Sequence, residues 1–156
     1  MLWSFVEKVS LIVYNEKKGL KDKPVWRDRM KKLQVIWQRL VDEEGETCDR
    51  CSLTEAAVEE AVNKLEQSLG ALGIGVVLKK ETLNHSAFSQ DPLQSNRIWI
   101  GGVALEEWLS AETGRSKCCS ACGDSECRTV IVDGNAYEAV PVDLIVEAGI
   151  IAATRL

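Results

Sequence analysis

The sequence predicts one α/β domain, built as an α+β sandwich, behind a short N-terminal extension. The composition is that of an ordinary soluble protein, since apolar residues make up 46% and charged residues 28% of the 156 residues. Apolar runs of strand length alternate with segments of helical periodicity, which favours a layered α/β arrangement. The six cysteines stand against a single histidine and fall into two clusters. Thiol chemistry is therefore the first chemistry to consider.

The N-terminal extension, residues 1–32, differs in charge from the domain that follows it at 33–156. Residues 16–32 carry a net charge of +5, whereas residues 33–156 carry −10. Apolar residues within 2–14 recur at helical spacing and predict a short amphipathic helix. That segment is interpreted as a membrane-surface or partner anchor, as a poorly ordered tail, or as sequence upstream of a translation start at Met30.

Large apolar and β-branched residues predict three strands, at 33–41, 74–80 and 97–100. An acidic loop at 42–50 follows the first strand. Ser52 with Glu55 fits a capping box, and Gly70 with Gly73 supplies a stop, so a long helix is expected between them. Its apolar stripe has seven members: Leu53, Ala57, Val58, Ala61, Val62, Leu65 and Leu69.

The remaining elements follow from shorter patterns. Residues 82–90 fit a helical turn only ambiguously, and Leu105, Trp108 and Leu109 predict a short helix. A turn at 133–134 predicts a hairpin of strands 129–132 and 137–140. Residues 142–153 predict a closing helix. Glu106 and Glu107 are interpreted as a solvated helix face or, alternatively, as proton acceptors for a thiol.

The sequence lacks the residues that several classes of function require. A net charge of −5 argues against a nucleic-acid binder. His85 is the only histidine and there is no glycine-rich phosphate loop, which argues against hydrolase triads, histidine-based zinc catalysis and nucleotide binding. The apolar runs are shorter than the roughly 20 residues of a membrane span. Glu7 and Lys8 interrupt the first apolar stretch, unlike a secretory signal, so we expect a cytoplasmic protein with reduced thiols.

The first cysteine cluster is Cys48-Asp49-Arg50-Cys51, between the first strand and the long helix. Two intervening residues let the sulfurs meet in a tight turn, and a helix N-terminus and Arg50 favour thiolate. Asp49 and the acidic loop oppose this effect. The pair is interpreted as a redox centre, as half of a metal site, or as two inert thiols.

Residues 33–109 resemble the thioredoxin-like fold, through a strand, a CxxC pair, a helix, a strand and then Ser95-Asn96-Arg97-Ile98-Trp99-Ile100 before a glycine turn. Redox-active members usually carry a cis-proline in the loop before the third strand, and Asn96 occupies the matching place here. Thr47 replaces the tryptophan that precedes the motif in thioredoxins proper. The resemblance implies that Cys48 attacks and that Cys51 resolves the mixed disulfide.

The segment from Trp37 to Ala153 resembles a family of small cysteine-rich prokaryotic proteins known only as a domain of unknown function. The resemblance is carried by four motifs: Trp37-Gln38-Arg39-Leu40; Thr47-Cys48-Asp49-Arg50-Cys51; Ser95-Asn96-Arg97-Ile98 with Gly101 and Glu106; and Cys118-Cys119 through Cys127-Arg128. It implies a fold and supplies no activity.

The second cluster contains four cysteines within ten residues: Cys118, Cys119, Cys122 and Cys127. Four thiolates suffice for tetrahedral Zn²⁺, and a CxxC from this cluster with the first pair would form another Cys₄ set. Such ligands suit zinc or other thiophilic metals. A redox relay, a resolving thiol pair and a local disulfide are the alternatives.

The sequence thus favours a thiol–disulfide redox protein that uses Cys48 and Cys51 on a protein thiol or disulfide partner. The alternative is a non-catalytic soft-metal binding or sensing protein that holds its ion with cysteines from two loops.

Overall fold

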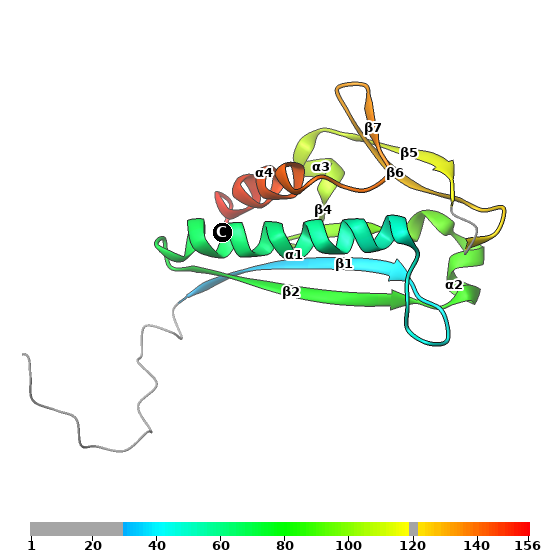
Figure 1. Ribbon diagram of the computed structural model, residues 1–156. Coiled ribbons are helices and arrows are strands. Elements are labelled where there is room, and N and C mark those ends of the chain that lie inside the picture. Colours follow the sequence, from blue (N-terminus) through cyan, green and yellow to red (C-terminus); the bar gives the residue numbers. More distant parts are fainter. Residues whose placement is uncertain (1–29, 119–121) are drawn as a thin grey trace, which may run out of the picture.

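A computed structural model describes residues 30–118 and 122–156, and all structural statements below concern these residues. They form a mixed α/β fold, as predicted (Figure 1). The predicted amphipathic segment and most of the basic linker lie outside the described residues. The elements, in chain order, are β1 (Lys31–Leu40), α1 (Asp49–Gly70), β2 (Ile74–Leu83), α2 (His85–Gln90), η2 (Pro92–Gln94), β3 (Arg97–Ile100), β4 (Val103–Ala104), α3 (Leu105–Leu109), β5 (Glu112–Lys117), β6 (Glu126–Val132), β7 (Asn135–Tyr137) and α4 (Val142–Ala153).

Four strands form the main sheet, in the order β2-β1-β3-β4. β1 pairs in parallel with β2 and antiparallel with β3, so β1 lies in the interior of the sheet. Its alternating residues Leu33, Val35 and Trp37 are fully buried. This period of two turns one side of β1 into the core. The C-terminal end of β1 leads into the loop that carries Cys48.

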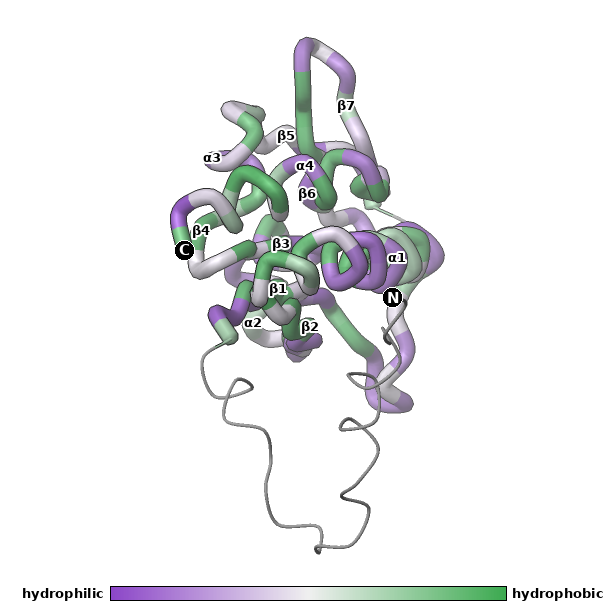
Figure 2. Tube along the Cα trace, turned by 90° about the vertical axis from the view of Figure 1, so that its left-hand side faces the viewer, coloured by the Kyte–Doolittle hydropathy of each residue, from purple (hydrophilic) through white to green (hydrophobic). Residues whose placement is uncertain are grey.

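Helices α1 and α4 pack against each other over one face of the main sheet (Figure 1). Figure 2 views α1 nearly end-on and shows that the turns of this helix contain both hydrophilic and hydrophobic residues. Leu65 is fully buried in this layer, and a Cβ placed on Gly149 of α4 would overlap its side chain. Glycine therefore permits the close approach of the two helices.

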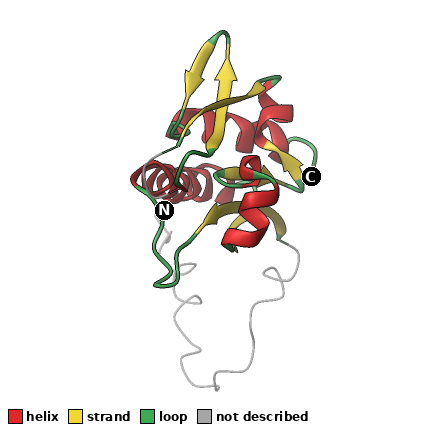
Figure 3. Cartoon of the chain, turned by 90° about the vertical axis from the view of Figure 1, so that its right-hand side faces the viewer, coloured by secondary structure: helices red, strands yellow, loops and turns green. Residues whose placement is uncertain are grey.

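The second sheet consists of β5, β6 and β7, in that order, and lies on the helix side of the main sheet (Figure 3). A buried ion pair ties it to the main fold: Arg128 Nε of β6 lies 2.7 Å from Glu106 Oε1 of α3. The interpretation of Glu106 as part of a solvated helix face is therefore wrong, because the carboxylate is buried against an arginine. Glu107 beside it is exposed.

The long helix starts earlier than the capping box predicted. It begins at Asp49 with Cys48 as N-cap, and Ser52 N–H already donates to the Cys48 carbonyl at 2.8 Å, as a residue inside the first turn does. Leu53, expected on the apolar stripe, is 64% exposed, because its neighbour Thr54 takes the buried position. The helix nevertheless covers the predicted core through Val58, Leu65 and Leu69.

Other differences concern the ends of the strands. β2 continues to Leu83, and the ambiguous segment that follows contains α2. The hairpin turn lies at Asp133–Gly134 as predicted, but its second strand is Asn135–Tyr137. β5 was not predicted at all. No helix among the described residues is long and apolar enough to cross a membrane.

Candidate functional site

Cys48 and Cys51 lie at the N-terminal end of α1, where β1 delivers the chain through the acidic loop. Cys48 is the N-cap residue, is half-buried, and precedes 22 helical residues. Cys51 lies one turn further on and is buried. Because the first N–H groups of a helix lack intrahelical acceptors, negative charge is stabilised at its N-terminus. The two sulfurs thus differ in access while sharing one helix end.

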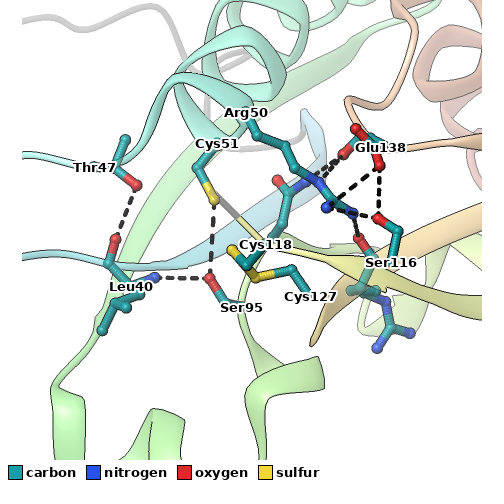
Figure 4. The surroundings of a disulfide bond; sticks show 11 residues. Leu40, Thr47, Arg50, Cys51, Ser95, Ser116, Cys118, Cys127 and Glu138 are labelled. Carbon is teal, nitrogen blue, oxygen red and sulfur yellow. Dashed lines mark hydrogen bonds and ion pairs between the residues drawn. A yellow bond between two sulfur atoms is a disulfide. The ribbon is translucent and has the colours of Figure 1, made fainter. Parts of the chain in front are cut away.

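The surroundings of Cys51 keep its thiol protonated. A hydrogen bond with Cys48, burial away from water and the nearby charge of Cys48 together raise the pKa of the Cys51 thiol well above its ordinary value, and hydrogen bonds from Thr47 and Ser95 oppose this only in part. Ser95 Oγ lies 3.9 Å from Cys51 Sγ and also accepts from Leu40 N–H at 2.9 Å (Figure 4). The loop before β3 therefore contacts the CxxC pair through Ser95.

Asn96 holds that loop in place. Its backbone adopts a left-handed conformation with φ of +58°, which asparagine tolerates better than most residues. Its side chain accepts a hydrogen bond from Trp37 Nε1 at 3.2 Å and donates one to the Glu138 carbonyl at 3.1 Å. The position predicted to match the cis-proline thus connects the main sheet to the segment after β7.

A small pocket of about 70 Å³ opens beside the CxxC pair. Its lining includes both cysteines of the pair, Cys122 of the second cluster and the exposed His85. Asp42 and Glu46 of the acidic loop form part of its rim. Cys48 is accordingly reachable from outside through a pocket that carries negative charge at its edge.

The four cysteines of the second cluster do not all have the same surroundings. Cys118 and Cys127 form a disulfide at the end of the β5–β6 ladder and are both buried. Cys122 packs against this disulfide. Cys119 lies outside the described residues.

The fold brings the two clusters together. The sulfur atoms of Cys48, Cys118 and Cys122 all lie within 4.8 Å of one another. Three thiolates at this spacing can hold a soft metal ion, but Cys118 becomes available as a ligand only when its disulfide is open. The same spacing places the Cys118–Cys127 bond beside the reactive end of α1, so both metal binding and thiol–disulfide exchange are chemically open to this cluster.

Arg50, between the two cysteines of the first pair, turns away from them toward the second sheet (Figure 4). Its buried guanidinium donates to Ser116 Oγ at 2.8 Å, to the Glu138 carbonyl at 2.9 Å and to the Arg128 carbonyl. Sequence reasoning treated Arg50 as a charge that favours thiolate. The structure shows that its guanidinium satisfies backbone and side-chain acceptors around the disulfide.

Sequence reasoning missed the part that Ser95 and the buried pair Glu106–Arg128 play near the site. Ser95 lay inside a recognised motif, and its position just before a predicted strand was the available signal. Glu106 and Arg128 also belonged to recognised motifs, but nothing in the sequence predicted their contact, because the two residues lie 22 positions apart and meet only through packing of the second sheet.

Comparison with known proteins gives a family and one relative. The profile of the family described as "Domain of unknown function (DUF2703)" matches residues 33–149. A protein of Archaeoglobus fulgidus described as "Uncharacterized protein" is 42% identical over 113 residues, which cover 72% of this chain and 82% of the relative. No solved structure gives a significant match.

Proposed function

The chain belongs to the DUF2703 family, and we propose that it carries out thiol–disulfide exchange through Cys48 and Cys51. One observation carries the proposal: a half-buried cysteine caps a long helix at the edge of a pocket, and a second, buried cysteine one turn away is hydrogen-bonded to it. This is the division into an accessible attacking sulfur and an inner resolving sulfur that disulfide exchange requires.

The reaction begins when the Cys48 thiolate attacks a disulfide of a protein partner. A bond forms between Cys48 and one partner sulfur, and the other partner sulfur leaves as a thiolate. Cys51 then gives its proton to a leaving thiolate and attacks Cys48 Sγ, which releases the second partner sulfur. The partner gains two electrons and the chain ends with a Cys48–Cys51 disulfide, which an external dithiol reductant restores.

The raised pKa of Cys51 fits this order of events. While Cys51 remains protonated it is a poor nucleophile, so Cys48 is the sulfur that attacks first. Formation of the mixed disulfide removes the hydrogen bond and the charge of Cys48, which are two of the three causes that raise the pKa of Cys51. The resolving sulfur is thereby activated only after the partner is attached.

The thioredoxin-like assignment belongs to the same proposal. Its support is the order of β1, the CxxC pair, α1 and a parallel β2, with the loop before β3 in contact with Cys51. We also propose a cytoplasmic location, because reductants that regenerate a dithiol pair are present in that compartment. The acidic rim formed by Asp42 and Glu46 favours partners with basic residues beside the reacting disulfide.

The test is trapping by single cysteine variants of the full chain. Cys51→Ser is expected to accumulate a mixed disulfide with an aromatic disulfide reagent at Cys48, whereas Cys48→Ser is expected to accumulate none at Cys51. Cys122→Ser serves as a control, because it removes a pocket cysteine outside the pair. Equal and slow alkylation of Cys48 and Cys51, near the rate of an ordinary thiol of pKa about 8.5, would contradict the proposal.

A soft-metal site is the second candidate function, and the approach of Cys48, Cys118 and Cys122 within 4.8 Å favours it. In this reading the reduced protein holds zinc or another thiophilic ion between the two clusters. Metal content and thiol titration of anaerobically purified protein distinguish the candidates. One equivalent of metal with protected thiols, lost in Cys122→Ser, supports the metal site. Reactive thiols without metal, with Cys118 and Cys127 held in their disulfide, support redox chemistry.

A further inference from the structure

We propose that the Cys118–Cys127 disulfide is an internal redox partner of the Cys48–Cys51 pair, so that the second sheet stores a second pair of electrons. The inference rests on the proposed function of Cys48 and Cys51 and adds a specific substrate for it. It assigns Cys118 as the sulfur that Cys48 attacks. Three observations support it, concerning access, distance and the way the two pairs are held together.

The first observation is access. Cys118 is 8% exposed and Cys127 is 3% exposed, so an external thiol has little approach to either sulfur. Cys48 by contrast is half-buried and lines an open pocket. Because thiol–disulfide exchange depends on access to the attacked sulfur, electrons from outside reach the buried disulfide most readily through Cys48.

The second observation is distance. Cys48 Sγ lies within 4.8 Å of Cys118 Sγ, close enough for a side-chain rotation to bring the sulfurs into contact. Cys48 is the N-cap residue of α1 and Cys118 directly follows β5, so each sulfur lies at the end of a regular backbone segment. The encounter therefore needs no rearrangement of the fold.

The third observation is Arg50, which fixes the two pairs relative to each other. Its guanidinium bonds Ser116, two residues before Cys118, and the carbonyl of Arg128, directly after Cys127. Both flanks of the disulfide are thus hydrogen-bonded to Arg50, which lies between Cys48 and Cys51 in the chain. Arg50 is a positioning residue for the transfer, since it acts on the reacting sulfurs only through their neighbours.

The transfer has two steps. The Cys48 thiolate attacks Cys118 Sγ, the Cys118–Cys127 bond breaks, a Cys48–Cys118 bond forms and Cys127 leaves as a thiolate. Cys51 then loses its proton to the Cys127 thiolate and attacks Cys48 Sγ, which breaks the Cys48–Cys118 bond and releases Cys118 as a thiolate. Two electrons have moved from the first pair to the second, and no external oxidant is required.

The test follows the reduction of the Cys118–Cys127 disulfide by dithiothreitol in the oxidised full-length protein. Samples are quenched by alkylation, and the disulfide-linked peptides are quantified by mass spectrometry. The internal route predicts that Cys48→Ser slows this reduction at least on the order of tenfold, because direct attack on buried sulfurs remains the only path. Serine is a good N-cap residue, so this variant preserves the start of α1.

Two further variants sharpen the test. Cys51→Ser is expected to slow the reduction and to show a Cys48–Cys118 peptide during the reaction, because the intermediate has lost its resolving sulfur. The control is Arg115→Ala, an exposed residue of β5 outside the pocket lining, which is expected to react at the wild-type rate. An Arg115→Ala variant as slow as Cys48→Ser would show that the slowing is not specific to Cys48 and would overturn the internal route.

The outcomes separate this inference from the function on which it rests. If Cys48→Ser loses the disulfide at the wild-type rate while Cys48 of the wild type still forms mixed disulfides with an aromatic disulfide reagent, the internal route is wrong and the redox function stands. If Cys48 of the wild type fails to react with that reagent, the proposed function itself is wrong.

Discussion

The two cysteine pairs are held by different parts of the molecule. Cys48 and Cys51 belong to the junction of β1 and α1, where the backbone of the main fold fixes their positions. Cys118 and Cys127 close the end of a β5–β6 ladder, and Cys118 N–H donates to the Ser125 carbonyl beside them. The first pair depends on the junction of a strand and a helix, whereas the second depends on a local ladder that Arg50 anchors to the rest of the fold. Variants that disturb one region and spare the other distinguish these two kinds of support.

The largest effect is expected from breaking the main fold that holds the first pair. Leu65→Asp places a charge at a fully buried position against α4, and an unpaired buried charge costs several kcal/mol against a total stability of about 5–15 kcal/mol. We expect loss of the cooperative melting transition, measured by circular dichroism. Leu53→Asp is the matched control, since Leu53 lies on the same helix and is 64% exposed. A native melting curve for Leu65→Asp would contradict the assigned packing of α1.

The contacts that hold the second pair are tested by Arg50→Ala. Removing the guanidinium leaves buried acceptors around β6 without a donor, and we expect a loss of about 3 kcal/mol in the free energy of unfolding. Urea denaturation measures the total, and hydrogen exchange is expected to rise more in β6 than in β1. Arg115→Ala on β5 is the control, because that side chain is exposed. An equal rise in both sheets would mean that Arg50 supports the fold generally.

The disulfide itself is expected to stabilise the region around Cys118 and Cys127 against unfolding. Replacing Cys118 and Cys127 together by alanine opens a loop with a sequence separation of 9, and loop-closure entropy then predicts a loss of about 2–3 kcal/mol. Cys122→Ala should cost less, since Cys122 is only partly buried and lies outside that disulfide. The midpoint of urea unfolding reports both values. Similar midpoints for the two variants would assign no stabilising role to the bond.

The smallest effect concerns the first pair and depends on pH. The raised pKa of Cys51 means that the folded protein keeps this proton at a pH where the unfolded chain has lost it. Its contribution to stability is therefore complete below the unfolded pKa of about 8.5 and declines as pH rises above it, by at most about 1.4 kcal/mol per pH unit. Cys51→Ala should lack this component of the slope between pH 8 and pH 10. The same slope in both proteins would contradict the assignment.

The sequence patterns were sufficient for most of the main fold and for few of the site's contacts. Residues 142–153 form α4 as predicted, because the spacing of their apolar residues indicates the helix face that packs on α1. β5 has the sequence Glu-Thr-Gly-Arg-Ser-Lys, which has no apolar alternation, and it is a strand only because β6 pairs with it. Likewise, the CxxC motif identified Cys48 and Cys51, whereas the approach of Cys118 to Cys48 arises from the docking of the second sheet. Sequence spacing carries no information on such a contact.

The position of Arg50 has a consequence for protein engineering. Exchanging the dipeptide between the cysteines is one way to change the reactivity of a CxxC pair, because charges beside a sulfur shift the pKa of its thiol. In this chain one of the two residues is also the anchor of the sheet that carries the disulfide. A grafted dipeptide would therefore change the chemistry of the motif and the placement of its neighbour at once, and Asp49, which is exposed, is the position where the motif can be retuned alone.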